Sequence, residues 1–242
     1  VSSSSVKLVE LSRAADGAYV LERCALETLE AGWIVDGSIE KFDEVVAVIE
    51  RVIKKSGTKA KNVAMALPAS AVITKKIVLP AGLSERELEL QVESEANQYI
   101  PFSLDEVSLD FCVIGPSPSS DEDEEVLIAA SRKEKVAERQ ELAEMAGLKP
   151  VVLDIESYAA RAVAMNQIQR LPNQGKDLIV ALFEMGSMST TLQVLQNGQV
   201  LYERDQVFGG AQLTQLIVRQ YGFSPEEAEQ KKRSGDLPED FS

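Results

Sequence analysis

Two short stretches of small, hydroxyl-bearing residues are the places where this sequence could do chemistry. The first is Ser2 to Ser5, which leads into an apolar run, and the second is residues 185–190, which follow one and contain Gly186. A turn of small residues lets backbone N–H groups approach an anion closely, and serine and threonine hydroxyls add further donors. Each stretch is therefore either a phosphate-binding turn or an ordinary polar turn.

The two stretches belong to a weak internal repeat. Residues 1–5 align with residues 185–189 when 184 is added to each number, and Leu8 and Leu11 then match Leu192 and Leu195. Each copy continues into an apolar run and a glycine-containing turn, ADGAYV in one and QNGQVL in the other. The repeat predicts two copies of a strand, a hydroxyl-rich turn and a second strand, and two such turns facing one another could hold a phosphate chain.

Composition excludes several classes of protein. The chain contains no histidine, so histidine-based triads, histidine general bases and histidine-ligated zinc are excluded, and a metal would need oxygen ligands. Acids outnumber bases 39 to 25, and the net charge of −14 argues against binding nucleic acid. No apolar run is long enough to cross a membrane, so we expect a soluble intracellular protein. Cys24 and Cys112 show no metal-type or redox spacing, and we expect both to be small core residues.

Strands and helices are expected to alternate, which predicts an α/β protein. In the first half we expect a hairpin over residues 6–11 and 18–26 and an amphipathic helix over residues 42–55, ended by Gly57. Two further strands are expected over residues 62–67 and 72–79. Ser84 and Glu87 have the spacing of a capping box, and Pro101 ends the helix that follows it near Tyr99.

The next predicted elements surround an acidic run. Strands over residues 107–114 and 126–130 enclose GPSPSSDEDEE, which we expect to be a mobile, solvated hairpin loop, with a docking patch as the alternative. A helix, a short strand and a second helix follow over residues 132–146, 151–153 and 155–169. RLPNQGKD, residues 170–177, is a natural boundary before a buried strand over residues 178–183.

Several longer stretches carry a resemblance to a known family. They are VSSSSVKLVELSR, SAVITKKIVLPAGLSERELELQVESEANQYIPFSLDEVSLDF, VLIAASRKE, AGLKPVVLDIESYA, and FEMGSMSTTLQVLQNGQVLYERDQVFGGAQLT followed by YGFSPEEAEQKKRSGDLP, and together they cover nearly the whole chain. In these stretches, of which EANQYIPF and GGAQLT are the most specific, the chain resembles the PilM family. Its members are actin-like cytoplasmic proteins of the type IV pilus machine and relatives of FtsA.

The resemblance implies an actin-like, ribonuclease H-like fold of two halves with an FtsA-type inserted subdomain. Residues 1–73 and 153–170 would form the first actin-like subdomain, residues 74–152 the inserted 1C subdomain, and residues 171–242 the second half. It also implies that the chain begins at the end of the first strand of the fold and ends before its late glycine-rich adenosine motif. Both halves are therefore expected to be incomplete.

An ATP cleft with Mg²⁺ is a further implication of the resemblance. Ser3, Ser4, Ser5 and Lys7 would belong to the first phosphate loop and its edge. The other nucleotide-binding residues would be Gly186, Ser187, Ser189, Thr190, Gly209, Gly210, Glu229 and Lys232. Glu184 would orient the metal or its water. The chain departs from the family at Glu184, where aspartate is usual, and at Ser2, where glycine is usual.

The family also implies a protein partner. A groove between the insertion and the first subdomain receives the cytoplasmic N-terminal peptide of the membrane protein PilN, which connects to PilO. For the rim of this groove we select Ile100, Pro101 and Phe102, with the alternative that Ile100 and Phe102 are simply core residues. The implied location is the cytoplasm, next to the inner membrane through this partner and without direct membrane insertion.

Three functions are compatible with these observations. The favoured one is a nucleotide-binding scaffold of the pilus machine, for which no catalytic residue is assigned. The second is an ATPase or sugar kinase of the same superfold, although no residue in the sequence marks a catalytic base. The third is a filament-forming cell-division protein like FtsA, and the L-type proteins of type II secretion are a near alternative to the pilus assignment.

Overall fold

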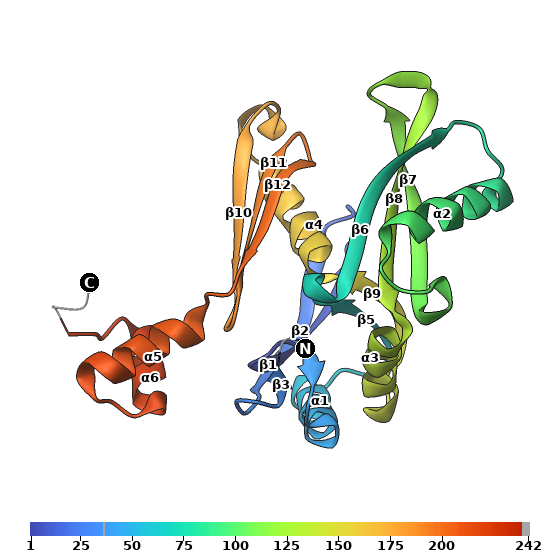
Figure 1. The fold of residues 1–242 in the computed structure, drawn as a ribbon. Helices are drawn as coiled ribbons and strands as arrows, with labels where there is room; N and C mark the ends of the chain where they lie inside the picture. Colours follow the sequence, from blue (N-terminus) through green and yellow to red (C-terminus); the bar gives the residue numbers. More distant parts are fainter. Residues whose placement is uncertain (36, 239–242) are drawn as a thin grey trace. The chain divides into compact units, whose positions relative to one another are not determined.

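The computed structural model describes residues 1–35 and 37–238 of the 242-residue chain. It divides into two compact units, Val1–Ala159 and Ala160–Ser242. Both units contain strands and helices, in agreement with the predicted α/β class (Figure 1). The last four residues of the predicted second half, 239–242, lie outside the described residues.

The first unit begins with an antiparallel hairpin and a helix that covers it. Strands β1 (Ser5–Arg13) and β2 (Tyr19–Thr28) form the hairpin, and helix α1 (Phe42–Ser56) contacts both strands. The apolar stripe of α1 packs with Val6 into a shared core, and Gly57 ends the helix in the left-handed conformation. The predicted hairpin and amphipathic helix are thus both confirmed.

A parallel strand pair lies in the same unit. Strand β5 (Asn62–Leu67) pairs in parallel with β9 (Lys149–Ile155), and helix α3 (Lys133–Met145) contacts both strands and α1. Leu142 of α3 is fully buried in the core that α1 shares with β1. A small hairpin, β3 (Ile34–Val35) and β4 (Ser38–Ile39), and a short helical turn, η1 (Ala69–Ala71), complete this region.

The part of the first unit predicted to be an insertion contains a three-stranded antiparallel sheet and one helix. The strand order is β6 (Val72–Pro80), β8 (Ser120–Arg132) and β7 (Val107–Ser117), and helix α2 (Glu85–Tyr99) lies along one face (Figure 1). Apolar residues of α2 and the sheet form a separate core, and η2 (Leu104–Glu106) precedes β7. The predicted capping box is present, because Ser84 Oγ accepts from Glu87 N and the Glu87 carboxylate accepts from Ser84 N.

The acidic run is not a loop, and the prediction of a mobile, solvated segment is wrong. Strands β7 and β8 continue to a two-residue turn at Pro118 and Ser119, and Glu124 of β8 pairs with both neighbouring strands. An acidic composition indicates that the side chains stay in solvent, but it does not show whether the backbone forms a strand or a loop. In a central strand the backbone hydrogen-bonds to both neighbours, while the acidic side chains project to the two faces of the sheet.

The two cysteines are both exposed, so their predicted place in the core is also wrong. Cys24 pairs with Val9 in the first hairpin, and Val9 is itself 61% exposed. Paired residues on antiparallel strands share a face, so Cys24 belongs to the more exposed face of the hairpin. A short apolar run does not reveal which of its alternating positions face the core.

The second unit contains an antiparallel meander and two packed helices. Helix α4 (Glu156–Ile168) crosses the boundary between the units, and η3 (Pro172–Gly175) follows it. Strands β10 (Ile179–Met185), β11 (Thr190–Gln196) and β12 (Gln199–Gln206) form the meander in that order. Helices α5 (Gly210–Tyr221) and α6 (Pro225–Ser234) pack against each other.

The internal repeat is visible in the strand register. The pairing of β1 with β2 shifts between Glu10 and Leu11, and the pairing of β11 with β12 shifts between Val194 and Leu195, 184 residues later. An irregularity at matching positions of two hairpins is stronger support for the repeat than the two leucine matches.

Candidate nucleotide-binding turns and partner-binding residues

The first hydroxyl-rich turn is closed by its own hydrogen bonds. Ser2 N donates to Ser5 O at 2.9 Å, and Ser2 Oγ donates to the same oxygen at 3.1 Å. Leu29 N, just after β2, donates to Ser4 O at 2.9 Å. Ser5 is buried, Ser3 is half-buried, and Lys7 is exposed on β1. The turn is therefore fixed at the start of the first hairpin.

The second turn repeats this hydrogen bond. Gly186 N donates to Ser189 O at 2.8 Å, and these two residues are the repeat equivalents of Ser2 and Ser5. Thr190 begins β11, and its Oγ1 donates to Phe208 O at 2.7 Å. The second turn is thus tied to the segment between β12 and α5 as well as to itself.

Helix α5 begins directly against the second turn. Gly210 N donates to Gly186 O and Ala211 N donates to Ser187 O, each at 2.9 Å. These bonds satisfy backbone donors that a helix N-terminus otherwise leaves unpaired. A Cβ atom at Gly209 would lie 2.5 Å from Ser187 O, so only glycine fits there. The structure therefore brings together four of the predicted nucleotide-binding residues, Gly186, Ser187, Gly209 and Gly210.

Glu229 and Lys232 belong to a polar cluster that joins α5 and α6. Lys232 Nζ donates to Gly210 O at 3.0 Å, to Thr214 Oγ1 at 2.8 Å and to Glu229 Oε2 at 2.5 Å. Thr214 Oγ1 lies 2.6 Å from Glu229 Oε2, and Arg233 Nε lies 2.8 Å from Glu229 Oε1. The cluster thus presents donors and acceptors beside the helix that begins at the second turn.

The ionised form of the Glu229 carboxyl group is strongly favoured. Burial alone would raise the pKa of this carboxyl group, but hydrogen bonds from Lys232, Thr214 and Arg233 outweigh burial and lower the pKa to about 2. Sequence reasoning missed Thr214. Its position four residues after Gly210, one helical turn along the GGAQLT motif, was the available signal.

Glu184 lies exposed on β10, in line with two polar residues of the neighbouring strands. It pairs with Thr191, which in turn pairs with Asp205 and donates from Oγ1 to Asp205 Oδ1 at 2.6 Å. Within residues 1–35 and 37–238, no three acidic or cysteine side chains are grouped to hold a metal ion. The residues present suit Mg²⁺ only with phosphate and water as most of its ligands, which is the mode this ion commonly adopts.

The three residues selected for the partner groove have different environments. Ile100 is 7% exposed and belongs to the core between α2 and its sheet, whereas Pro101 and Phe102 are exposed. The guanidinium carbon of Arg132 lies 5.6 Å from the centre of the Phe102 ring. Ile100 is thus a core residue, as the alternative interpretation expected, whereas Phe102 is not. A contact of any of the three residues with a partner stays a prediction.

Comparison with known proteins establishes the family. The model of the family described as type IV pilus assembly protein PilM matches residues 1–242. The chain belongs to the PilM family. The solved structure "PilM-PilN type IV pilus biogenesis complex" contains a chain of 30% sequence identity, with a TM-score of 0.80 over 96% of this chain and 67% of that one. This PilM-family chain therefore spans about two thirds of the length of that relative.

A more distant match concerns the fold alone. The ethanolamine utilization protein EutJ from Carboxydothermus hydrogenoformans is 14% identical, with a TM-score of 0.51 over 96% of this chain and 58% of that one. The actin-like fold predicted for this PilM-family protein is confirmed. None of the helices in the described part of the chain has the length and apolar character that crossing a membrane requires.

Proposed function

We propose that this PilM-family protein is an ATP-binding scaffold of the type IV pilus machine that binds the cytoplasmic N-terminal peptide of PilN. The observation that carries the proposal is the 30% identity over nearly the whole chain to a protein solved in a PilM-PilN complex. Through PilN the protein would be held at the inner membrane and linked to PilO.

The nucleotide part of the proposal rests on the second turn and the α5–α6 cluster. Ser187 and Ser189 would supply hydroxyl donors to phosphates, Thr190 would hold the turn through its bond to Phe208 O, and Glu184 would orient Mg²⁺ through water. Glu229 supplies an ionised acceptor for sugar hydroxyls next to the second turn, and Lys232, whose three N–H groups donate to Gly210, Thr214 and Glu229, holds that carboxylate in place. When bound, the nucleotide and its metal would supply charges that stabilise the conformation of the turns. Binding, rather than hydrolysis, is the role proposed for these residues.

The partner part of the proposal places the PilN peptide between the inserted sheet and the first part of the unit Val1–Ala159. The exposed ring of Phe102 offers an apolar rim there, while Ile100 would act only by supporting the position of that rim.

A co-purification experiment tests this function. The first residues of PilN, fused to a soluble carrier, are mixed with the full-length protein and recovered through the carrier. The proposal predicts stoichiometric recovery that is lost when these residues are deleted. Equal recovery with the carrier alone would contradict it. A Phe102→Ala variant, compared with Phe183→Ala in the other unit, then tests the rim.

A further inference from the structure

Positive charges are concentrated in one segment of this acidic chain. Residues 51–84 contain seven lysines and arginines and no acid, whereas residues 85–125 contain thirteen acids and one arginine. Five of the seven bases fall within residues 51–61, at the end of α1 and in the segment that leads to β5. A net charge of −14 already keeps the chain soluble, so solubility does not account for a cluster of positive charges.

The fold adds a sixth cation to this cluster. Strand β9 begins beside the start of β5, where Lys149 N donates to Lys61 O at 2.7 Å. The basic patch, as we call the cluster, is made of six exposed residues, Arg51, Lys54, Lys55, Lys59, Lys61 and Lys149. The end of α1, the connection from α1 to β5 and the start of β9 therefore contribute to one charged surface of the first unit.

Contacts within the protein account for few of these charges. Lys55 Nζ lies 2.7 Å from Glu27 Oε1, and Lys61 Nζ donates to Gly147 O at 3.3 Å. The other four members of the patch make no hydrogen bond or ion pair through their side chains with the residues that the structure describes. Most of the patch is thus available to an external anion.

The dipole of α1 explains only part of the patch. The C=O groups at the end of a helix carry partial negative charge, which favours the two lysines in the last turn of α1. Lys59, Lys61 and Lys149 lie outside this helix, and the effect falls off within one turn. Glu50 precedes the patch on α1, and Glu144 is in the last turn of α3. With the acid already paired, three carboxylates oppose six cations, so the patch keeps an excess of positive charge.

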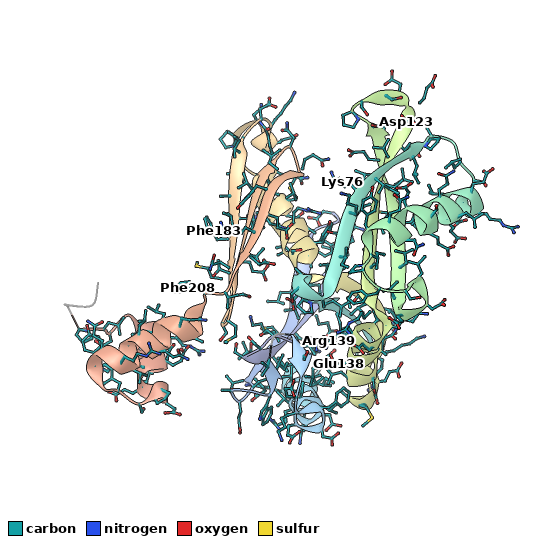
Figure 2. All side chains as sticks on the ribbon, in the orientation of Figure 1. Lys76, Asp123, Glu138, Arg139, Phe183 and Phe208 are labelled. Atoms are coloured by element: carbon teal, nitrogen blue, oxygen red, sulfur yellow. The ribbon has the colours of Figure 1, made fainter. Side chains whose placement is uncertain are left out.

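The acids of the insertion do not cancel the patch. Figure 2 labels Lys76 on β6 and Asp123 on β8, and Lys76 Nζ lies 3.7 Å from Glu125 Oε2. From Glu125, β8 continues for seven residues to Arg132 before α3 begins, a length of about 23 Å at the rise of a strand. The Debye length at physiological ionic strength is about 8 Å. The acidic end of β8 and the basic patch are therefore separate electrostatic surfaces.

We propose that the basic patch contacts the anionic surface of the inner membrane through lipid phosphate groups, without entering the bilayer. The inference rests on the proposed function, which holds the protein next to this membrane through PilN. Basic residues are attracted to an anionic bilayer within about one Debye length of its surface. Lysine is a flexible point charge, which suits many mobile phosphates, whereas recognition of one fixed phosphate favours arginine.

A tether makes such a weak contact effective. A patch with a small excess charge binds a bilayer reversibly by itself, and stable attachment needs a second signal. The PilN peptide supplies that signal, because it holds the patch at a high effective concentration near the lipid. The patch then determines which face of the first unit is turned toward the membrane.

The test measures co-sedimentation of the full-length protein with lipid vesicles at about 0.1 M salt. One set of vesicles contains phosphatidylcholine alone, and the other also contains phosphatidylglycerol, which is anionic. A triple variant removes three charges of the patch, through Lys54→Gln, Lys59→Gln and Lys149→Gln. The matched control removes three exposed cations of the other unit and has the same net charge, through Lys176→Gln, Arg204→Gln and Arg219→Gln.

We expect the wild-type protein to bind the vesicles that contain phosphatidylglycerol and not those of phosphatidylcholine alone. Binding should be lost at about 1 M salt, where the Debye length is about 3 Å. The patch variant should bind about a hundredfold more weakly, since each lysine near an anionic surface contributes about fivefold, and the control should bind like the wild type. Equal binding by the two variants, or no preference of the wild type for phosphatidylglycerol, would overturn the inference. Tighter binding to a short DNA duplex at the same salt would overturn it in favour of nucleic acid.

A second arm separates this inference from the proposed function. Both kinds of vesicle then carry the PilN N-terminal peptide on a lipid anchor. The patch variant should still bind the peptide on phosphatidylcholine and should lose only the additional affinity that phosphatidylglycerol provides. If the wild type ignores the peptide but prefers phosphatidylglycerol, PilN binding is rejected and the lipid contact stands. If the peptide is bound equally on both kinds of vesicle, the lipid contact alone is rejected.

Discussion

The two hydroxyl-rich turns are built alike and held differently. Each is closed by one backbone bond at matching positions, Ser2 N to Ser5 O at 2.9 Å and Gly186 N to Ser189 O at 2.8 Å. Each leads into an antiparallel hairpin with a register shift at the same place. Beyond this bond, Leu29 N ties the first turn to the end of its own hairpin, whereas the second also receives the first N–H groups of α5.

A repeated local motif acquires its role from the segments that pack against it. Ser4 O of the first turn accepts from a residue of the same hairpin, so that turn is a local structure. Gly186 O and Ser187 O of the second turn accept from α5, whose first residue also contacts Lys232 of α6. A change in the second turn is therefore transmitted to both helices, while a change in the first is expected to stay within its hairpin.

We expect Gly209→Ala to disrupt the contact between the second turn and α5 and to have the largest effect on the free energy of unfolding. Its Cβ would lie 2.5 Å from Ser187 O and 2.6 Å from Gly186 O, and these backbone atoms cannot move aside cheaply. We expect a loss of about 3 kcal/mol in the free energy of unfolding, measured by urea denaturation. Gly210→Ala is the control, because its Cβ would meet the flexible Lys232 Nζ at 3.3 Å. Similar losses for both variants would contradict this account.

Thr190→Ala and Ser2→Ala compare the two turns directly. Each removes one hydroxyl bond, from Thr190 Oγ1 to Phe208 O or from Ser2 Oγ to Ser5 O, and each should cost about 1 kcal/mol of unfolding free energy. The two variants should differ in the rate of backbone amide hydrogen exchange. Thr190→Ala should speed exchange at the amides of Gly210 and Ala211, and Ser2→Ala should not. Faster exchange at these amides in both variants would show that the turns are not independent.

Glu229→Gln should change how the free energy of unfolding depends on pH, with its full effect at neutral pH and a smaller effect in acid. The folded-state pKa of about 2 lies below the ordinary value of 4.5, so this carboxylate stabilises the fold above about pH 4.5. The stabilisation is lost as the pH falls toward about 2. Thermal unfolding across this window should show a flatter pH dependence for Glu229→Gln than for Glu226→Gln, a control on the exposed surface of α6. Parallel curves would contradict the proposed network.

Features encoded by neighbouring residues could be predicted from the sequence. The capping box of α2 needs only Ser84 and Glu87 at the correct spacing, and the end of α1 needs only Gly57 after an amphipathic run. The turns were found in the same way, because their small residues and hydroxyls are consecutive. The pairing of the second turn with α5 was not predictable from local pattern, since it joins residues more than twenty positions apart.

Features that depend on tertiary environment were missed for physical reasons. The acidic residues of β8 suggested a loop, yet the strands on both sides satisfy its backbone. Arg139 is buried on α3, a helix with a mixed polar and apolar sequence, because the β3–β4 hairpin covers it. No spacing rule shows that a neighbouring segment will remove an arginine from water.

The most direct test of the account is calorimetric titration of the full-length protein with the PilN N-terminal peptide, with and without Mg-ATP. A PilN-binding scaffold should bind the peptide saturably, at one peptide per protein, in both conditions. A difference in affinity would measure the coupling between the nucleotide and partner sites. Absence of binding in both conditions, by protein whose thermal unfolding shows that it is folded, would contradict the proposed function.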